Sequence, residues 1–193
     1  MTFYSFAKVI VTLVLKPFYR FEVIGEENIP EEGPVILCCN HISMMDPIAL
    51  GITSPRPISF MAKEELFKIP ILKQIIKALY AFPVKRGKGD RMALRTGLQI
   101  LREGKVFGIF PEGTRSKSGE LGKGLSGVGF FALKTDAAVV PCAIIGPYRL
   151  FRKMRVVYGK PIDMQDLKER RASAKEATEV IMTHIQEILL QYK

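Results

Sequence analysis

The stretch PVILCCNHISMMDP, residues 34–47, joins an apolar run of strand length to a polar turn and then to an Asp-Pro pair. The run PVILCC has the length and continuous apolar character of a buried strand. Pro47 is well placed as the first residue of a helix, where its missing N–H costs nothing. A strand that ends near Asn40 and a helix that begins near Pro47 predict one strand–turn–helix unit.

Strand-length runs alternate with helical patterns along the rest of the chain. The helical stretches begin with a segment that Pro70 interrupts early, continue after an expected N-cap at Asp90 and stop at Gly104. The proline in the run AVVPCAII points to an edge strand or a bulge. The expected strands are 34–39, 58–62, 81–84, 105–110, 138–145 and 154–159, and the expected helices are 65–80, 91–103, 127–135 and 177–192. This alternation predicts a single α/β domain with a largely parallel mixed sheet flanked by helices.

Composition narrows the class of protein and of partner. The chain has 193 residues, 48% hydrophobic and 25% charged, which suits one folded domain. Its net charge of +10 favours anionic partners such as nucleic acid, phosphorylated substrates or anionic lipid. The three cysteines form neither a disulfide framework nor a zinc cluster, so no metal is expected and a reducing, cytosolic side is the default.

The N-terminal segment combines an apolar run, FYSFAKVIVTLVL at 3–15, with the mixed stretch KPFYRF at 16–21. A bilayer-spanning helix needs about 20 apolar residues, and this run is shorter. Cations interleaved with aromatic residues suit a helix that lies in the headgroup region. We therefore expect residues 1–20 to be an interfacial membrane segment and residues 21–193 to be the domain. A core helix that caps the domain is the alternative.

His41 and Asp46 can form a pair across the turn of the opening stretch. An offset of five residues separates two side chains on one helix by roughly 140°, and it places them on opposite faces of one strand. They can therefore meet only across a turn. A histidine held by a carboxylate is a general base near neutral pH. Asp46 is also a plausible N-cap of the following helix, and one carboxylate can serve both roles.

A protein nucleophile for His41 is lacking. The stretch GLSGV at 124–128 resembles a hydrolase nucleophile elbow but lacks the final glycine. The cysteines lie in apolar strands. His41 is therefore expected to deprotonate a substrate hydroxyl directly. The second histidine, His184, falls on the apolar side of the last helix and is expected to be a packed residue.

Cations follow three of the expected strands. FPEGTRS at 110–116 places the forked cation of Arg115 near Gly113, which allows a close backbone approach, and Glu112 can orient the arginine or accept a substrate hydroxyl. FPVKRGKGDR at 82–91 carries four cations, and Lys63 lies just past a third strand. Loops at strand ends of α/β sheets bind ligands. The alternatives are a surface turn, a solvated face and a plain surface lysine.

Four motifs together resemble the glycerolipid acyltransferases. NHISMMDP, FPVKRG, FPEGTRS and VVPCAI occur in the order and spacing of that family's motifs, and the resemblance covers residues 20–162. It implies the acylation of 1-acyl-sn-glycerol-3-phosphate (lysophosphatidic acid) by acyl-CoA or acyl carrier protein, which yields phosphatidic acid. It requires no bound cofactor or metal.

The resemblance also implies a role for each matching residue. His41 is the base of the His-x4-Asp motif and Asp46 its orienting acid. The other residues are a set that binds the acceptor and its phosphate, namely Lys63, Arg86, Glu112, Gly113, Thr114 and Arg115, and a residue of the acyl-chain region, Pro141. The expected place is the cytoplasmic face of the cell membrane, with peripheral or monotopic attachment.

Two rival functions remain. One is acylation of a different acceptor, such as glycerol-3-phosphate or another lysophospholipid. The other is a non-catalytic binder of anionic lipid, which would not require the His-Asp pair. Nucleic acid is not expected as a partner, because the chain has no tryptophan and the basic stretch 82–91 lacks interleaved aromatic residues.

Overall fold

The computed structural model describes residues 3–15, 17–85 and 90–192. The strands are β1 Arg20–Ile24, β2 Val35–Cys39, β3 Ile58–Lys63, β4 Phe82–Val84, β5 Val106–Ile109, β6 Ala138–Ile145 and β7 Lys153–Tyr158. The α-helices are α1 Phe3–Leu15, α2 Asp46–Thr53, α3 Pro70–Ala78, α4 Arg91–Arg102, α5 Gly127–Lys134, α6 Gln165–Glu169 and α7 Ala174–Tyr192. Two 3-10 turns, η1 Glu26–Asn28 and η2 Glu64–Lys68, precede β2 and α3.

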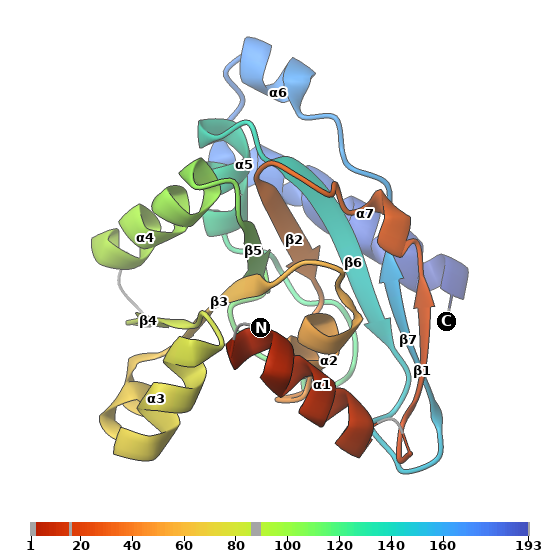
Figure 1. Ribbon diagram of the computed structural model, residues 1–193. Helices are drawn as coiled ribbons and strands as arrows, with labels where there is room; N and C mark the ends of the chain where they lie inside the picture. Colours follow the sequence, from red (N-terminus) through yellow and green to blue (C-terminus); the bar gives the residue numbers. More distant parts are fainter. Residues whose placement is uncertain (1–2, 16, 86–89, 193) are drawn as a thin grey trace.

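The described strands form one seven-stranded sheet in the order β1-β7-β6-β2-β5-β3-β4 (Figure 1). Strands β2 to β6 all run parallel to their neighbours within that group. Strand β7 is antiparallel to β6, and β1 is parallel to β7. The largely parallel mixed sheet expected from the sequence is confirmed. Because the carboxyl ends of β2 to β6 meet at one edge, the loops that follow them gather there.

Helices cover both faces of the sheet (Figure 1). Alternate residues of β2 point to opposite faces of the sheet. Ile36 and Cys38 lie in the core under α4, α5 and α7, and Leu37 lies in the core under α2. All five residues of β2 are buried. The unbroken apolar run at 35–39 is explained by this position, because a central strand of a two-sided sheet needs apolar side chains on both faces.

Helix boundaries follow the local signals that the sequence carries. The Asp90 carboxylate accepts hydrogen bonds from the backbone N–H groups of Met92 and Ala93, which makes it the N-cap of α4. Gly104 takes a φ of +70° just after that helix ends, a conformation that glycine adopts at low cost. Pro70 starts α3 after the 3-10 turn. The expected N-cap, stop and break are all confirmed.

Strand β6 is a central strand, so the expectation of an edge strand was wrong. It lies between β2 and β7, and its Pro141 is buried. Cys142 pairs with Tyr158 and Val139 with Ile162. Between these two pairs, two residues of β6, 140–141, face three residues of the opposite segment, 159–161. One extra residue in the opposite segment is a β-bulge. The bulge, which was the other half of the expectation, accommodates the proline.

Two further features differ from the sequence expectations. Strand β1 was not anticipated. This five-residue edge strand forms because it pairs with β7, and its own sequence has no clear strand pattern. His184 was expected to be packed, but its side chain is 43% exposed and its Nδ1 lies 3.2 Å from Glu187 Oε2.

Helix α1 lies across α2, at the lower side of the molecule in Figure 1. The Tyr4 hydroxyl accepts a hydrogen bond from Ile58 N at 3.2 Å, and Lys8 Nζ donates to the Ser54 carbonyl at 2.5 Å. Within the described part of the chain, none of the helices has both the length and the apolar character needed to cross a membrane.

Candidate active site

His41 and Asp46 meet across the turn after β2. The distance between His41 Nδ1 and Asp46 Oδ2 is 2.7 Å. Asp46 is fully buried and the His41 side chain is 13% exposed. The carboxylate accepts from Nδ1–H, which leaves Nε2 of the neutral ring with its lone pair. The pair therefore has the arrangement of a general base and the acid that orients it.

Asp46 does not cap its own helix. It is the first residue of α2, and the N-cap position belongs to Met45, which makes no side-chain capping bond. Asp46 Oδ2 instead accepts from the backbone N–H groups of Ile42 and Ser43, each at 2.7 Å, besides His41. The carboxylate thus shapes the turn that carries the histidine, and the N-cap interpretation of Asp46 was wrong.

Tyr148 is a site residue that the sequence analysis missed. Its hydroxyl donates to Asp46 Oδ1 at 2.7 Å from the loop after β6. Burial raises the pKa of Tyr148, and the Asp46 carboxylate raises it further, so the phenol stays protonated and donates. No local pattern joins residues 102 positions apart, and only the fold brings this pair together.

The His41 ring stacks on Phe110. Their centroids are 4.1 Å apart with an interplanar angle of 21°, and Phe110 stacks in turn near Phe60. Phe110 precedes the FPEGTRS loop, so the loop and the base are fixed against each other. The stacked wall and the Asp46 bond leave the imidazole little rotational freedom.

Glu112 connects the loop after β5 to the turn after β2. One carboxylate oxygen accepts from His41 N and the other from Gly122 N, each at 2.8 Å. Ser116 N donates to the His41 carbonyl at 2.7 Å. Because both carboxylate oxygens of Glu112 hold backbone N–H groups, its place in the structure is that of a positioning residue. Asn40 has a similar function, since its side chain bonds both backbone groups of Ile144 on β6.

Of the remaining predicted phosphate and acceptor residues, those that the structure describes lie at the same edge of the sheet. Lys63 ends β3, and Thr114 and Arg115 follow β5; all three are exposed. The side chains of Lys63 and Arg115 make no hydrogen bond or ion pair within residues 3–15, 17–85 and 90–192, so their charges are available to a ligand. Gly113 has a φ of +65°, and a Cβ there would lie 2.5 Å from Leu125. Arg86 lies outside the described residues.

Two further groups of residues lie within strands of the sheet. Pro141 is inside the sheet, paired with Cys38 of β2, with its ring next to Gly159. The three cysteines are buried, and burial raises the pKa of each thiol. They are therefore held as neutral thiols and are poor nucleophiles. Among the described residues, no cluster of three or more His, Cys, Asp or Glu side chains is arranged to hold a metal ion.

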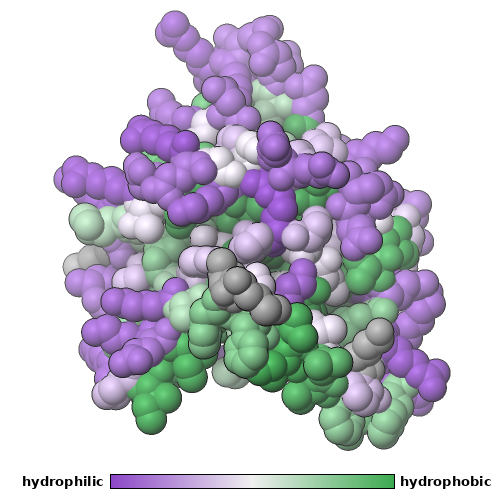
Figure 2. Space-filling view, in the orientation of Figure 1, coloured by the Kyte–Doolittle hydropathy of each residue, from purple (hydrophilic) through white to green (hydrophobic). Residues whose placement is uncertain are grey.

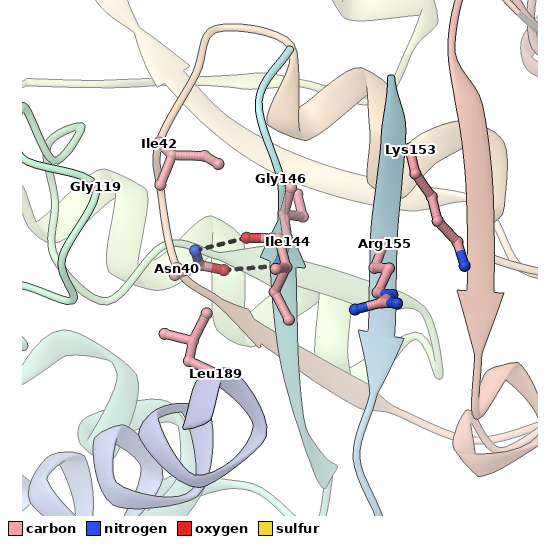
Figure 3. A pocket seen from close by; sticks show the side chains of 9 residues that line it. Asn40, Ile42, Gly119, Ile144, Gly146, Lys153, Arg155 and Leu189 are labelled. Atoms are coloured by element: carbon pink, nitrogen blue, oxygen red, sulfur yellow. Dashed lines mark hydrogen bonds between the residues drawn. The ribbon is translucent and has the colours of Figure 1, made fainter. Parts of the chain in front are cut away.

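A hollow of about 520 Å³ lies beside the dyad turn on the α7 face (Figure 3). Asn40 and Ile42, the neighbours of His41, line it. Its cations are Lys153 and Arg155, and both pair with Glu22 of β1, at 2.8 and 2.7 Å. These ion pairs join β1 to β7, so the two cations that line the hollow have a structural role.

Comparison with known proteins agrees with this geometry. The family model described as "Acyltransferase" matches residues 20–145, more than half of the chain. The 1-acyl-sn-glycerol-3-phosphate acyltransferase of Bacillus subtilis (strain 168) is 33% identical over 90% of this chain and 92% of its own length. The enzyme of that name from Borreliella burgdorferi is 33% identical over 68% of this chain and 53% of its own length.

A solved structure agrees as well. The crystal structure of the 1-acyl-sn-glycerophosphate (LPA) acyltransferase PlsC from Thermotoga maritima matches 98% of this chain and 80% of that chain. The TM-score is 0.78 and the identity 28%. The family model over residues 20–145 and the identity to the Bacillus subtilis enzyme show that the chain belongs to the acyltransferase family.

Proposed function

We propose that the protein transfers an acyl group from an acyl thioester to the sn-2 hydroxyl of 1-acylglycerol-3-phosphate, which yields phosphatidic acid. The observation that carries the proposal is the 2.7 Å bond between His41 Nδ1 and Asp46 Oδ2 at the carboxyl edge of the sheet. The Bacillus subtilis 1-acyl-sn-glycerol-3-phosphate acyltransferase, which matches 90% of this chain, supports the same reaction.

The proposed reaction needs one base and no covalent enzyme intermediate. Nε2 of His41 takes the proton of the substrate hydroxyl while the hydroxyl oxygen attacks the thioester carbonyl carbon. The C–S bond breaks, and the imidazolium returns the proton to the departing thiolate sulfur. Asp46 stabilises the imidazolium by its charge, and Tyr148 and the two backbone donors keep the carboxylate in place.

Acceptor binding is assigned to the cations at the carboxyl edge. Lys63 and Arg115 extend from the ends of two neighbouring strands, β3 and β5, and both are exposed. A phosphate held by charge-assisted bonds would fix the position of the hydroxyl against His41. Arg86, which follows β4, is proposed as a third contact on the strength of the motif. Thr114 completes the polar acceptor loop, and Pro141 stays a proposal for the acyl-chain region.

Membrane attachment is assigned to residues 1–20, with residues 21–193 as the acyltransferase domain. The face of α1 that packs on the protein carries Tyr4 and Lys8, and the outward face carries the apolar side chains Phe3, Phe6, Val9, Ile10, Leu13 and Val14. A helix that turns apolar residues outward suits the surface of a bilayer. Peripheral or monotopic attachment at the cytoplasmic face is part of this proposal, with acyl-CoA or acyl carrier protein as the soluble donor.

One experiment tests the reaction and its rivals together. The purified full chain is incubated with lysophosphatidic acid, glycerol-3-phosphate or lysophosphatidylcholine, each with acyl-CoA or acyl carrier protein, and the products are read by mass. Phosphatidic acid as the dominant product supports the proposal. Preferential acylation of another acceptor would reassign the substrate, and the absence of any acylation would leave a non-catalytic lipid binder.

A further inference from the structure

Helix α3 carries an apolar stripe that the fold leaves uncovered. None of its residues is buried. Ile71 is 77% exposed and Ile75 44% exposed, and an offset of four places them on one side of the helix. Helix α4 is also amphipathic, but it buries Ala93 and Leu101 against the core. The core thus covers the apolar side of α4, whereas the apolar side chains of Ile71 and Ile75 on α3 are open to solvent.

The polar side of α3 is cationic. Lys73 and Lys77 lie roughly opposite Ile71 and Ile75 at 100° per residue. Residues 66–80 contain three lysines and no acidic residue. Residues 3–21 likewise contain basic residues and no acidic one. Two copies that joined through these faces would bring like charges together, whereas an anionic lipid surface is complementary to them.

Helices α1 and α3 share one side of the molecule. Tyr4 of α1 stacks on Tyr80, two residues after α3, with ring centroids 5.3 Å apart. Figure 2 shows apolar side chains gathered at the lower edge, where Figure 1 places α1 and α3. Met44, in the turn that joins His41 to Asp46, is 73% exposed. The turn that carries the dyad thus also exposes an apolar side chain.

We propose that α3 is a second bilayer-contacting element, which works with α1 to hold the active-site edge on an anionic membrane. Ile71 and Ile75 enter the boundary of the acyl chains, and Lys73 and Lys77 remain at headgroup level. Lys63 precedes the η2–α3 segment directly, so a lipid phosphate at headgroup level lies near the proposed phosphate site. The inference rests on the lipid acceptor proposed above, and vesicle binding tests it without turnover, so the two proposals fail separately.

A single introduced fluorophore tests the contact, because the chain has no tryptophan. The variants are Ile71→Trp and, as a matched control, Leu190→Trp, since Leu190 is a 70% exposed residue of α7. Vesicles of phosphatidylglycerol and phosphatidylcholine in equal amounts should shift the emission of the first variant to the blue. Brominated acyl chains should quench it, and the second variant should respond to neither. An Ile71→Trp spectrum that vesicles leave unchanged would overturn the proposal.

Loss of the stripe provides the second arm of the test. The Ile71→Ser/Ile75→Ser variant should need about tenfold more lipid for half-maximal vesicle binding, while Leu190→Ser binds as the unchanged protein does. The KM for acceptor presented in vesicles should rise, and the kcat on a short-chain monomeric acceptor should stay. A variant that binds vesicles normally but changes its mass by light scattering would show that a second copy covers the stripe, which would overturn the proposal.

Discussion

The hydroxyl of Tyr148 donates a hydrogen bond to Asp46 Oδ1 at 2.7 Å, on the oxygen that does not contact His41. One carboxylate oxygen thus serves the base and the turn, and the other is held by a tyrosine from the loop after β6. The orientation of the base depends on a contact between distant parts of the chain.

Tyr148→Phe should lower kcat about tenfold and leave both KM values nearly unchanged, because it frees the carboxylate to rotate and removes no substrate contact. The lost bond to a charged group should cost about 1.5–3 kcal/mol of stability. Tyr158→Phe is the matched control, since the Tyr158 hydroxyl is hydrogen-bonded to Thr53 of α2, the helix that begins at Asp46. Steady-state kinetics and melting curves on both variants are the measurement. An equal loss of kcat in the control would reduce Tyr148 to a packing residue.

Glu112→Gln should destabilise the loop and slow the reaction. The amide has one accepting oxygen, so its NH₂ would face the N–H of His41 or of Gly122, and an unpaired buried donor costs about 1–3 kcal/mol. Glu120→Gln, an exposed change in the same loop, should have no effect. Unaltered melting and kcat in the Glu112 variant would contradict its place as a positioning residue.

Arg115→Ala should raise the KM for lysophosphatidic acid and leave the donor KM nearly alone. Loss of one charge-assisted contact corresponds to about 1.5–3 kcal/mol. Arg115→Lys should recover little, because a point charge cannot replace the fork. Lys117→Ala controls for general loss of loop charge. A rise in the donor KM alone would move Arg115 to the thioester side.

The buried thiols predict resistance to alkylation. Burial raises the pKa of Cys38, Cys39 and Cys142, so below that raised pKa they are protonated and the reactive thiolate is scarce. Iodoacetamide at neutral pH should leave the mass and the activity of the native protein unchanged until denaturant is added. Fast modification of one cysteine with loss of turnover would point to a thiol nucleophile instead of a direct transfer.

Local sequence signals predicted the fold well where the structure depends on local chemistry. The apolar run at 35–39, the cap at Asp90 and the stop at Gly104 each act within a few residues of the chain. Pro141 indicated an edge strand or a bulge, and only the bulge is present, because one extra residue in the neighbouring segment accommodates the proline in a central strand. Strand β1 was missed because its pairing with β7 is a long-range effect.

The site divides in the same way. His41 and Asp46 are five residues apart, so the sequence could predict that they meet across a turn. The capping role given to Asp46 was wrong. Tyr148 and the backbone bonds of Glu112 were beyond reach, because they join segments 102 and 71 positions apart in sequence. Arg86 and Pro141 remain predictions of the family motifs.

Asp46→Asn tests the dyad most directly. The asparagine oxygen can accept the three bonds that Oδ2 accepts now, and its NH₂ can donate to the Tyr148 oxygen, so the fold is expected to persist. The charge that stabilises the imidazolium is lost, and the same change in a serine-protease triad costs roughly 10⁴-fold. Melting temperature and kcat are measured on one sample. We predict an unchanged melting temperature with kcat reduced at least about a hundredfold; a near-normal kcat would contradict the catalytic pair.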